Sequence, residues 1–454
     1  MKRSLHRLRC GFFVSIVVAA LSALSAPAAG ATAPGTITEY SAGLHGNPGA
    51  LVAGPDGNVW FTDFTAPRTV GKITPAGAIT EYSSGLNPGS KAGPITVGSD
   101  GNIWFTDDGT TSAVGRVTPA GAITEYSSGL NAGSIPGQIT TGPDGNVWFT
   151  DLGTIPAIGR VTPAGAIAEY SIGLQVGSEL GAPVAGPDGN VWFLDFAAGA
   201  PAIGKVTPAG AITEYSAPLG TEPLDLTKGP DGNLWFTDGG TPAIGRITPS
   251  GTISTFTTGL NAGSDPIEIA AGSDGSLWFT DQGSTPALGR ITTSGTITEY
   301  SAGLQVGSKP VGPTAGPDGN LWFTTYGSAT PGVGRITPGG EITEYSSGLG
   351  AGSAPSGGAV AGPDGNMWFA DDGTTHAIGQ IVLGSDSPPV AGGGGSGPST
   401  GGSGPTAPPP ATAPVHRKKP LKCKRGYRKT VKHGKARCVK RNHRHHRARK
   451  GGRS

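Results

Sequence analysis

Hydrophobic and polar positions alternate in short runs along most of this chain, and the runs recur with a fixed period. A typical copy reads GPDGNVWFTD, then AIGRVTPAGAITEYS, then GLNAGS and a proline. Eight tryptophans mark the copies at spacings of 43 to 46 residues: Trp60, Trp104, Trp148, Trp192, Trp235, Trp278, Trp322 and Trp368. A period of this length is typical of solenoids, propellers and arrays.

Each copy holds four short runs with strand character, bounded by turn sequences. In one copy we expect strands at residues 139–141, 147–151, 157–162 and 166–171. The PDGN and PAGA segments between them suit tight turns with a left-handed glycine. The unit is therefore predicted to be a meander of four antiparallel strands, with PDGN and PAGA on one face and the longer loops on the other.

Two features favour a closed propeller over a solenoid. Val147 and Phe149 point to one side of the second strand and Trp148 to the other, as expected for a sheet packed between two neighbours. The first strand is built from small residues in every copy, which lets the sheets narrow towards an axis.

The ends of the repeat region predict how the ring closes. A lone fourth strand at residues 36–41 precedes the first copy, and the last copy stops after its third strand at 378–382. Pairing of these two segments would remove a free sheet edge. We predict an all-β fold, an eight-bladed β-propeller of four-stranded antiparallel blades, with a seven-bladed ring as the alternative.

The segments outside the repeats differ in composition. Residues 1–33 have a basic start, a short apolar run and small residues, the form of a cleaved secretory signal, with an uncleaved anchor as the alternative. Residues 34–384 form the propeller, 385–415 a flexible, disordered Gly/Pro/Ser linker, and 416–454 a basic tail. We expect a secreted monomer, extracellular or associated with the cell envelope, with no membrane span after cleavage.

Charge is divided unevenly along the chain. The net charge of +2 hides an acidic propeller, with 30 acidic and 11 basic residues in 34–384, and a segment 385–454 with 18 basic residues and one acid. On an exported protein such a tail predicts binding to anionic cell-surface polymers, with nucleic acid less favoured. The expected contacts are Arg417, Lys418, Lys419, Lys422, Lys424, Arg425, Arg428 and Lys429.

Two cysteines remain once the signal is removed. Cys423 and Cys438 both lie in the tail, and an even count in an oxidising compartment predicts a disulfide between them.

The repeated WFTD, IGRIT and ITEY segments of residues 34–384 resemble those of the virginiamycin B lyase family. This resemblance implies a seven-bladed propeller that linearises a cyclic depsipeptide antibiotic by elimination across a C–O ester bond. It further implies a histidine acid/base, placed directly after the proline that opens the first strand in two neighbouring blades, and a Mg²⁺ ion near acidic side chains. Here the matching positions hold residues such as Gly49, Leu224 and Ile267, and none is histidine.

The acidic part of such a site is better represented. Glu222 precedes Pro223 as the resemblance implies, and Asp265 precedes Pro266. Asp225 and Glu268 follow on the first strands of the same two copies, where other copies carry neutral residues. Together these four acids could hold a hard cation, and a solvated acidic patch is the favoured alternative.

Two further residue sets were candidates for chemistry. His45 and His376 are the only histidines of residues 34–384 and are expected on the loop face at the ring closure, where surface histidines are the favoured interpretation. The WFTD aspartates are expected to cap loop amides. The IGR arginines and ITEY glutamates are expected to form surface pairs.

These patterns favour a ligand-binding or catalytically altered propeller held at an anionic surface by its tail. The alternatives are an active carbon–oxygen lyase that uses a divalent metal, and a structural surface protein. The ligand is expected on the loop face or in the central channel.

Overall fold

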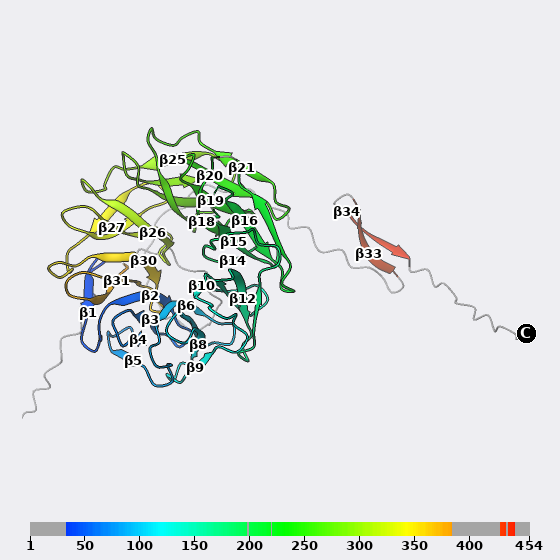
Figure 1. The fold of residues 1–454 in the computed structure, drawn as a ribbon. Helices are drawn as coiled ribbons and strands as arrows, with labels where there is room; N and C mark the ends of the chain where they lie inside the picture. Colours follow the sequence, from blue (N-terminus) through cyan, green and yellow to red (C-terminus); the bar gives the residue numbers. More distant parts are fainter. Residues whose placement is uncertain (1–32, 198, 219, 384–426, 433–434, 441–454) are drawn as a thin grey trace, which may run out of the picture. The chain divides into compact units, whose positions relative to one another are not determined.

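The computed structural model describes residues 33–197, 199–218, 220–383, 427–432 and 435–440 (Figure 1). The chain divides into two units, Met1–Pro389 and Val390–Ser454. The expected signal, linker and Cys423 lie outside the described residues, so the disulfide and export stay predictions. No helix long and apolar enough to cross a bilayer occurs within the described ranges.

The first unit contains eight four-stranded antiparallel sheets arranged around a centre, which confirms the eight-bladed propeller and excludes the seven-bladed alternative (Figure 1). The inner strands are β2 (Pro48–Ala53), β6 (Ala92–Val97), β10 (Pro136–Thr141), β14 (Val184–Ala185), β18 (Pro223–Lys228), β22 (Pro266–Ala271), β26 (Lys309–Ala315) and β30 (Pro355–Ala361). The second strands are β3 (Val59–Asp63), β7 (Ile103–Asp107), β11 (Val147–Asp151), β15 (Val191–Asp195), β19 (Leu234–Asp238), β23 (Leu277–Asp281), β27 (Leu321–Tyr326) and β31 (Met367–Asp371).

The outer half of each blade follows the same order. The third strands are β4 (Thr69–Ile73), β8 (Ala113–Val117), β12 (Ala157–Val161), β16 (Ala202–Val206), β20 (Ala243–Ile247), β24 (Ala287–Ile291), β28 (Gly332–Ile336) and β32 (Ala377–Ile381). The fourth strands are β5 (Ile79–Tyr82), β9 (Ile123–Tyr126), β13 (Ile167–Tyr170), β17 (Ile212–Ser216), β21 (Ile253–Phe256), β25 (Ile297–Tyr300), β29 (Ile342–Tyr345) and, for the last blade, β1 (Ile37–Tyr40). Blade one is β2–β5, and the blades are numbered along the chain up to blade eight.

The N-terminal strand closes the ring as the sequence predicts. β1 pairs antiparallel with β32, with Ile37 opposite Ile381 and Tyr40 opposite Ile378. The Tyr40 ring stacks on Trp368 with centroids 5.9 Å apart. The first and last blades are thus joined without a covalent link.

The core consists of slabs between adjacent blades rather than one central cluster. At one interface Trp60 and Val70 of blade one pack against Ile103 and Phe105 of blade two, and each other interface repeats this arrangement. The two apolar faces of the second strand therefore serve two neighbours, as its alternation predicts.

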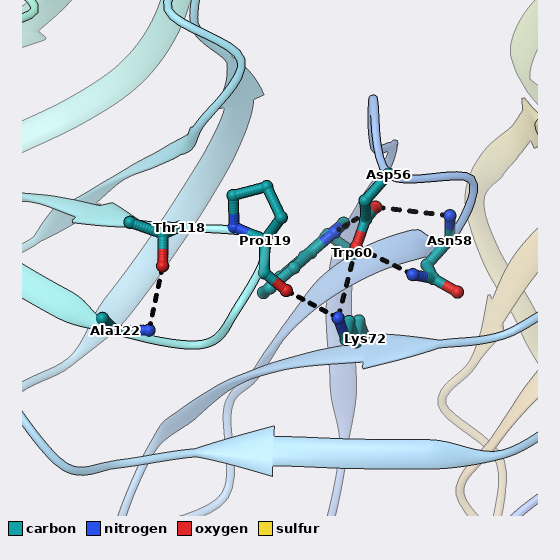
Figure 2. Close-up of polar contacts among 7 residues, drawn as sticks. All are labelled: Asp56, Asn58, Trp60, Lys72, Thr118, Pro119 and Ala122. Atoms are coloured by element: carbon teal, nitrogen blue, oxygen red, sulfur yellow. Dashed lines mark hydrogen bonds and ion pairs between the residues drawn. The ribbon is translucent and has the colours of Figure 1, made fainter.

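The buried indole N–H groups are satisfied by the PDGN turns (Figure 2). Trp60 Nε1 donates to Asp56 Oδ1 at 3.0 Å, and Lys72 Nζ lies 3.3 Å from Asp56 Oδ2 and donates to Pro119 O of the next blade at 2.7 Å. Burial would raise the pKa of Asp56, but the donors Trp60, Asn58 and Lys72 outweigh it and hold that pKa below its ordinary value. Basic residues at this position therefore link PDGN and PAGA turns on one face.

The prediction that IGR arginines and ITEY glutamates form surface pairs is wrong. In blade three Glu169 stands opposite Gly159, whereas Arg160 stands opposite Ala168. Successive side chains of a strand point to opposite faces, so the arginine and the glutamate lie on different faces of the blade. The ion pairs among the described residues instead join basic residues to the aspartate of the turn before the second strand, as in Lys205–Asp188 and Arg290–Asp274.

The second unit contains two strands that the sequence did not predict. β33 (Tyr427–Lys432) and β34 (Lys435–Lys440) pair antiparallel over six residues each. Part of the basic tail is therefore a β-ribbon.

Candidate functional site

A cavity of about 600 Å³ opens at the inner strands of blades five to seven. Its walls come from β18, β22 and β26: Leu224, Asp225, Ile267, Glu268, Ile269, Gly312, Pro313 and Thr314. The narrow inner strands expose backbone N–H groups that no further strand can pair, so side chains at this edge are well placed to accept from them.

Asp225 and Glu268 both accept hydrogen bonds from such backbone N–H groups. Asp225 Oδ2 accepts the N–H of Ile269 in the next blade at 2.8 Å, and its Oδ1 accepts the N–H of Leu226 at 2.9 Å. Glu268 Oε2 accepts the N–H of Gly312, again one blade further on, at 2.5 Å. The two acids therefore link three consecutive inner strands.

The same position makes both groups hard to ionise. Burial raises the pKa of Asp225 to about 6, and the charge of Glu268 adds to this while the two backbone donors oppose it. Burial also raises the pKa of Glu268, against the donor Gly312. The cavity thus combines aliphatic walls with two acids whose pKa is raised by burial.

The other two predicted acids are not part of this cavity. Glu222 is exposed, and Asp265 is half-buried. Their backbone N–H groups donate to Asp238 and Asp281 at 2.7 and 2.8 Å. The structure brings Asp225 and Glu268 together and leaves Glu222 and Asp265 in the loops that enter their strands.

The donor set of the cavity does not fit the magnesium ion that the resemblance implies. Both oxygens of Asp225 and one of Glu268 already accept a backbone N–H, and burial raises the pKa of both carboxyl groups, which disfavours the ionised form that binds a cation. A Mg²⁺ ion requires near-octahedral oxygen coordination. No chemistry at this cavity is therefore assigned to a metal.

A second cavity of about 480 Å³ lies against the inner strands of blades eight, one, two and three. Its walls include Asn47, Phe64, Gln138 and Asp372 beside several glycines. Neither cavity has histidine among its lining residues. These two cavities therefore offer acids, amides and apolar surface but no imidazole.

The WFTD aspartates cap loop amides, as expected. Asp151 Oδ1 accepts the N–H of Ile135 at 2.7 Å and that of Gly153 at 2.8 Å. Similar bonds hold loops in the other blades that carry the aspartate, for example from Lys91 and Gly109 to Asp107, whereas blade seven has Thr325 at this position.

Sequence reasoning missed that this aspartate meets the ITEY glutamate of its own blade in blades one to four, six and eight. In blade three the Glu169 carboxylate accepts the N–H of Asn131 at 2.6 Å and the hydroxyl of Ser134 at 3.5 Å. Burial and the nearby Asp151 raise the pKa of Glu169 to about 7. The register explains the pairing, because the small residues Ala157 and Gly159 stand on the third strand opposite Asp151 and Glu169.

The two predicted histidines have different surroundings. His45 is exposed and lies in a group with Asp63 and Glu81, whose ligand atoms are all within 4.8 Å of one another. This is the only such group of three or more potential metal ligands within the described ranges, and it does not include His376. His376 is half-buried, with a buried Nδ1 that has no hydrogen-bond partner.

Comparisons with known proteins agree with this architecture. The virginiamycin B lyase family model matches residues 26–257 and 176–386. No curated protein sequence matches the chain.

Two of the similar solved structures are lyases. Virginiamycin B lyase from Staphylococcus aureus, a catalytically inactive histidine-to-alanine variant with quinupristin, is 30% identical, with a TM-score of 0.53 over 77% of this chain and 99% of that one. A streptogramin B lyase structure is also 30% identical, with a TM-score of 0.51 over 77% and 98%. A puromycin hydrolase variant shares only the fold, at 14% identity and a TM-score of 0.50 over 73% and 59% of the chains.

Proposed function

Because the chain belongs to the virginiamycin B lyase family, we propose that it is a catalytically altered member that binds a cyclic depsipeptide without opening it. The fold that presents the ligand is retained, with one more blade than the resemblance implies. The histidines that would perform elimination are not retained.

The observation that carries this proposal is the composition of the cavity in blades five to seven. Ring opening by elimination requires a positioned group that removes a proton. The similar Staphylococcus aureus lyase is inactive when one of its histidines is replaced by alanine. Here the cavity presents Leu224 and Ile267 beside two acids that are already bonded to backbone amides.

The surroundings suit a large, partly apolar ligand. Phe64 and Leu152 directly follow a second strand and Tyr326 ends one, and their side chains are 41%, 47% and 44% exposed. Phe64 also lines the second cavity. Exposed aromatic and aliphatic side chains near a concave site provide contact area for such ligands. Asp225 and Glu268 add acceptors and, when ionised, negative charge for amide or ammonium groups.

The proposal includes attachment at the cell surface. The charge separation between an acidic propeller and a basic tail supports a secreted protein whose tail binds anionic polymers while the propeller faces away from them. The described β-ribbon in the tail carries basic residues such as Arg428 and Lys429 on β33.

One observation favours a second candidate, an active lyase with a different base. A carboxyl group whose pKa is raised to about 6, as for Asp225, has the proton affinity that a general base needs near neutral pH. In that case Asp225 would act in place of the histidine base that the family resemblance implies.

The experiment that separates the two candidates uses the full mature chain with quinupristin and Mg²⁺. Binding is followed by calorimetry and ring opening by chromatography, with the Staphylococcus aureus lyase as positive control. We expect binding that weakens in Asp225→Asn and not in the matched control Glu222→Gln, whose side chain is exposed and outside the cavity. Ring opening that disappears in Asp225→Asn would establish the lyase instead, and failure of quinupristin to bind would refute the proposed ligand.

A further inference from the structure

The acid pair of blade one differs from its equivalents in three ways. The loop before β2 is two residues shorter than the loop before β6, so the serine found at Ser90 has no counterpart there. His45 occupies the position of Asn87, Asn131 and Asn261. Thr69 replaces an alanine such as Ala113 at the start of the third strand.

These changes place an imidazole beside the two carboxyl groups. The backbone N–H of His45 donates to Glu81 Oε1 at 2.7 Å, which is the bond that Asn131 makes to Glu169 in blade three. The side chain of His45 stands with Asp63 and Glu81 so that one ligand atom from each lies within 4.8 Å of the others. The backbone arrangement of the repeat is thus kept while the side chain changes.

Asp63 contributes a buried carboxylate to this group. Its side chain is 0% exposed, and its Oδ1 accepts the N–H of Thr65 at 2.7 Å. Its Oδ2 is buried and has no hydrogen-bond partner, a property that it shares with the equivalent aspartates of blades two, three, five and eight. In blade one the residue before the inner strand, Asn47, donates to Thr65 Oγ1 instead of to the aspartate, which leaves Asp63 with fewer donors than Asp107. A buried acceptor without a donor is costly unless a cation or proton compensates it.

The carboxylate of Glu81 is held in position by hydrogen bonds. Its Oε2 accepts the hydroxyl of Thr69 at 2.5 Å, a contact that alanine at this position in other blades does not provide. Hydrogen bonds of this kind orient carboxylates that bind metal ions. Each oxygen of Glu81 keeps a further lone pair.

From this geometry we propose that His45, Asp63 and Glu81 form a binding site for a zinc-type divalent ion. One imidazole nitrogen and two carboxylates are a donor set that Zn²⁺ accepts, and three protein ligands leave a fourth position for water. Tetrahedral bonds of about 2.0–2.1 Å bring ligand atoms to roughly 3.4 Å from one another. Because His45 lies in an exposed loop, its imidazole can move from within 4.8 Å of the two carboxylates to this shorter distance when the ion binds.

The ion would also connect two parts of the ring. His45 lies in the loop that leaves β1, the strand that completes blade eight, whereas Asp63 and Glu81 belong to β3 and β5 of blade one. Metal binding should therefore stabilise the folded propeller against unfolding.

The test is thermal unfolding of the full chain followed by tryptophan fluorescence, with Zn²⁺ or with a chelator. All eight tryptophans lie in residues 60–368, so metal bound by the tail cysteines and histidines does not produce this signal. At a Zn²⁺ concentration about a hundred times the Kd we expect the Tm to rise by about 3–4 °C. His45→Asn, which installs the residue that blades two, three and six carry, should fold normally and lose the rise.

His376→Asn is the matched control and should keep the rise, because His376 is outside the group. The proposal is overturned if Zn²⁺ leaves the Tm of the wild-type chain unchanged. It is also overturned if His45→Asn keeps the full rise, or if Mg²⁺ produces an equal rise that does not depend on His45.

Discussion

Replacing Ile37 with alanine tests the ring closure, because this buried side chain belongs to β1, the strand that forms the non-covalent seam. Ile37 is 4% exposed, stands opposite Ile381 and packs in one cluster with Trp322 and Phe369. Truncation of a buried isoleucine to alanine costs about 2–5 kcal/mol of the free energy of unfolding. A propeller of about 350 residues has an unfolding entropy near 0.7 kcal/mol per kelvin, so a loss of about 3 kcal/mol lowers the Tm by about 4 °C.

Ile297→Ala is the matched control for this experiment. Ile297 holds the same position on β25 of blade six, is 6% exposed and sits in a blade whose four strands are continuous in sequence. Unfolding is followed by tryptophan fluorescence in a temperature scan and in a urea titration. We expect similar losses for the two variants. A normal Tm for Ile37→Ala beside a lowered Tm for Ile297→Ala would show that β1 does not close the ring.

Three further predictions concern pH, the disulfide and the tail. Burial is the main cause that raises the pKa of four glutamates from 4.5 to about 7: Glu125, Glu169, Glu214 and Glu299. Their contribution to the free energy of unfolding is therefore complete below pH 4.5 and is lost as the pH rises through 7, so the Tm should be several degrees higher at pH 5 than at pH 8. A Cys423–Cys438 disulfide should make non-reduced secreted protein two hydrogens lighter than reduced protein, and two alkylatable thiols would contradict it. Retention of the full chain on isolated cell envelopes should fall steeply with salt, whereas equal retention of a chain ending at residue 415 would move the attachment to the propeller.

The repeat made most of the fold predictable. The second strand at residues 147–151 was placed at its observed bounds, because its alternation has to serve two packing interfaces. The first strand was predicted too short, since β10 begins at Pro136 and includes a bulge before Ile139. Bulges at an inner edge depend on contacts with the neighbouring blade, which a single copy does not reveal.

Side-chain pairing was harder to predict than the backbone. The arginine–glutamate pairs failed because the expectation ignored which face of the strand each residue occupies. The Asp151–Glu169 pair joins residues far apart in the unit and became visible only when the register placed glycine and alanine between them. The shortened loop around His45 is visible in the sequence. The sequence does not show that this loop places His45 beside Glu81, because that proximity follows only from the fold.

The central claim, that the propeller has kept its ligand cavity and lost the elimination chemistry, is tested most directly by restoring histidine. The family resemblance places its two histidines directly after the prolines that open neighbouring inner strands, and Leu224 and Ile267 occupy those positions and line the cavity beside Asp225 and Glu268. The measurement is the initial rate of quinupristin ring opening by the wild-type chain and by the Leu224→His/Ile267→His double variant. The account predicts a wild-type rate equal to that of buffer and a measurable rate for the double variant. A wild-type rate above buffer that falls in Glu268→Gln, with no gain in the double variant, would contradict it.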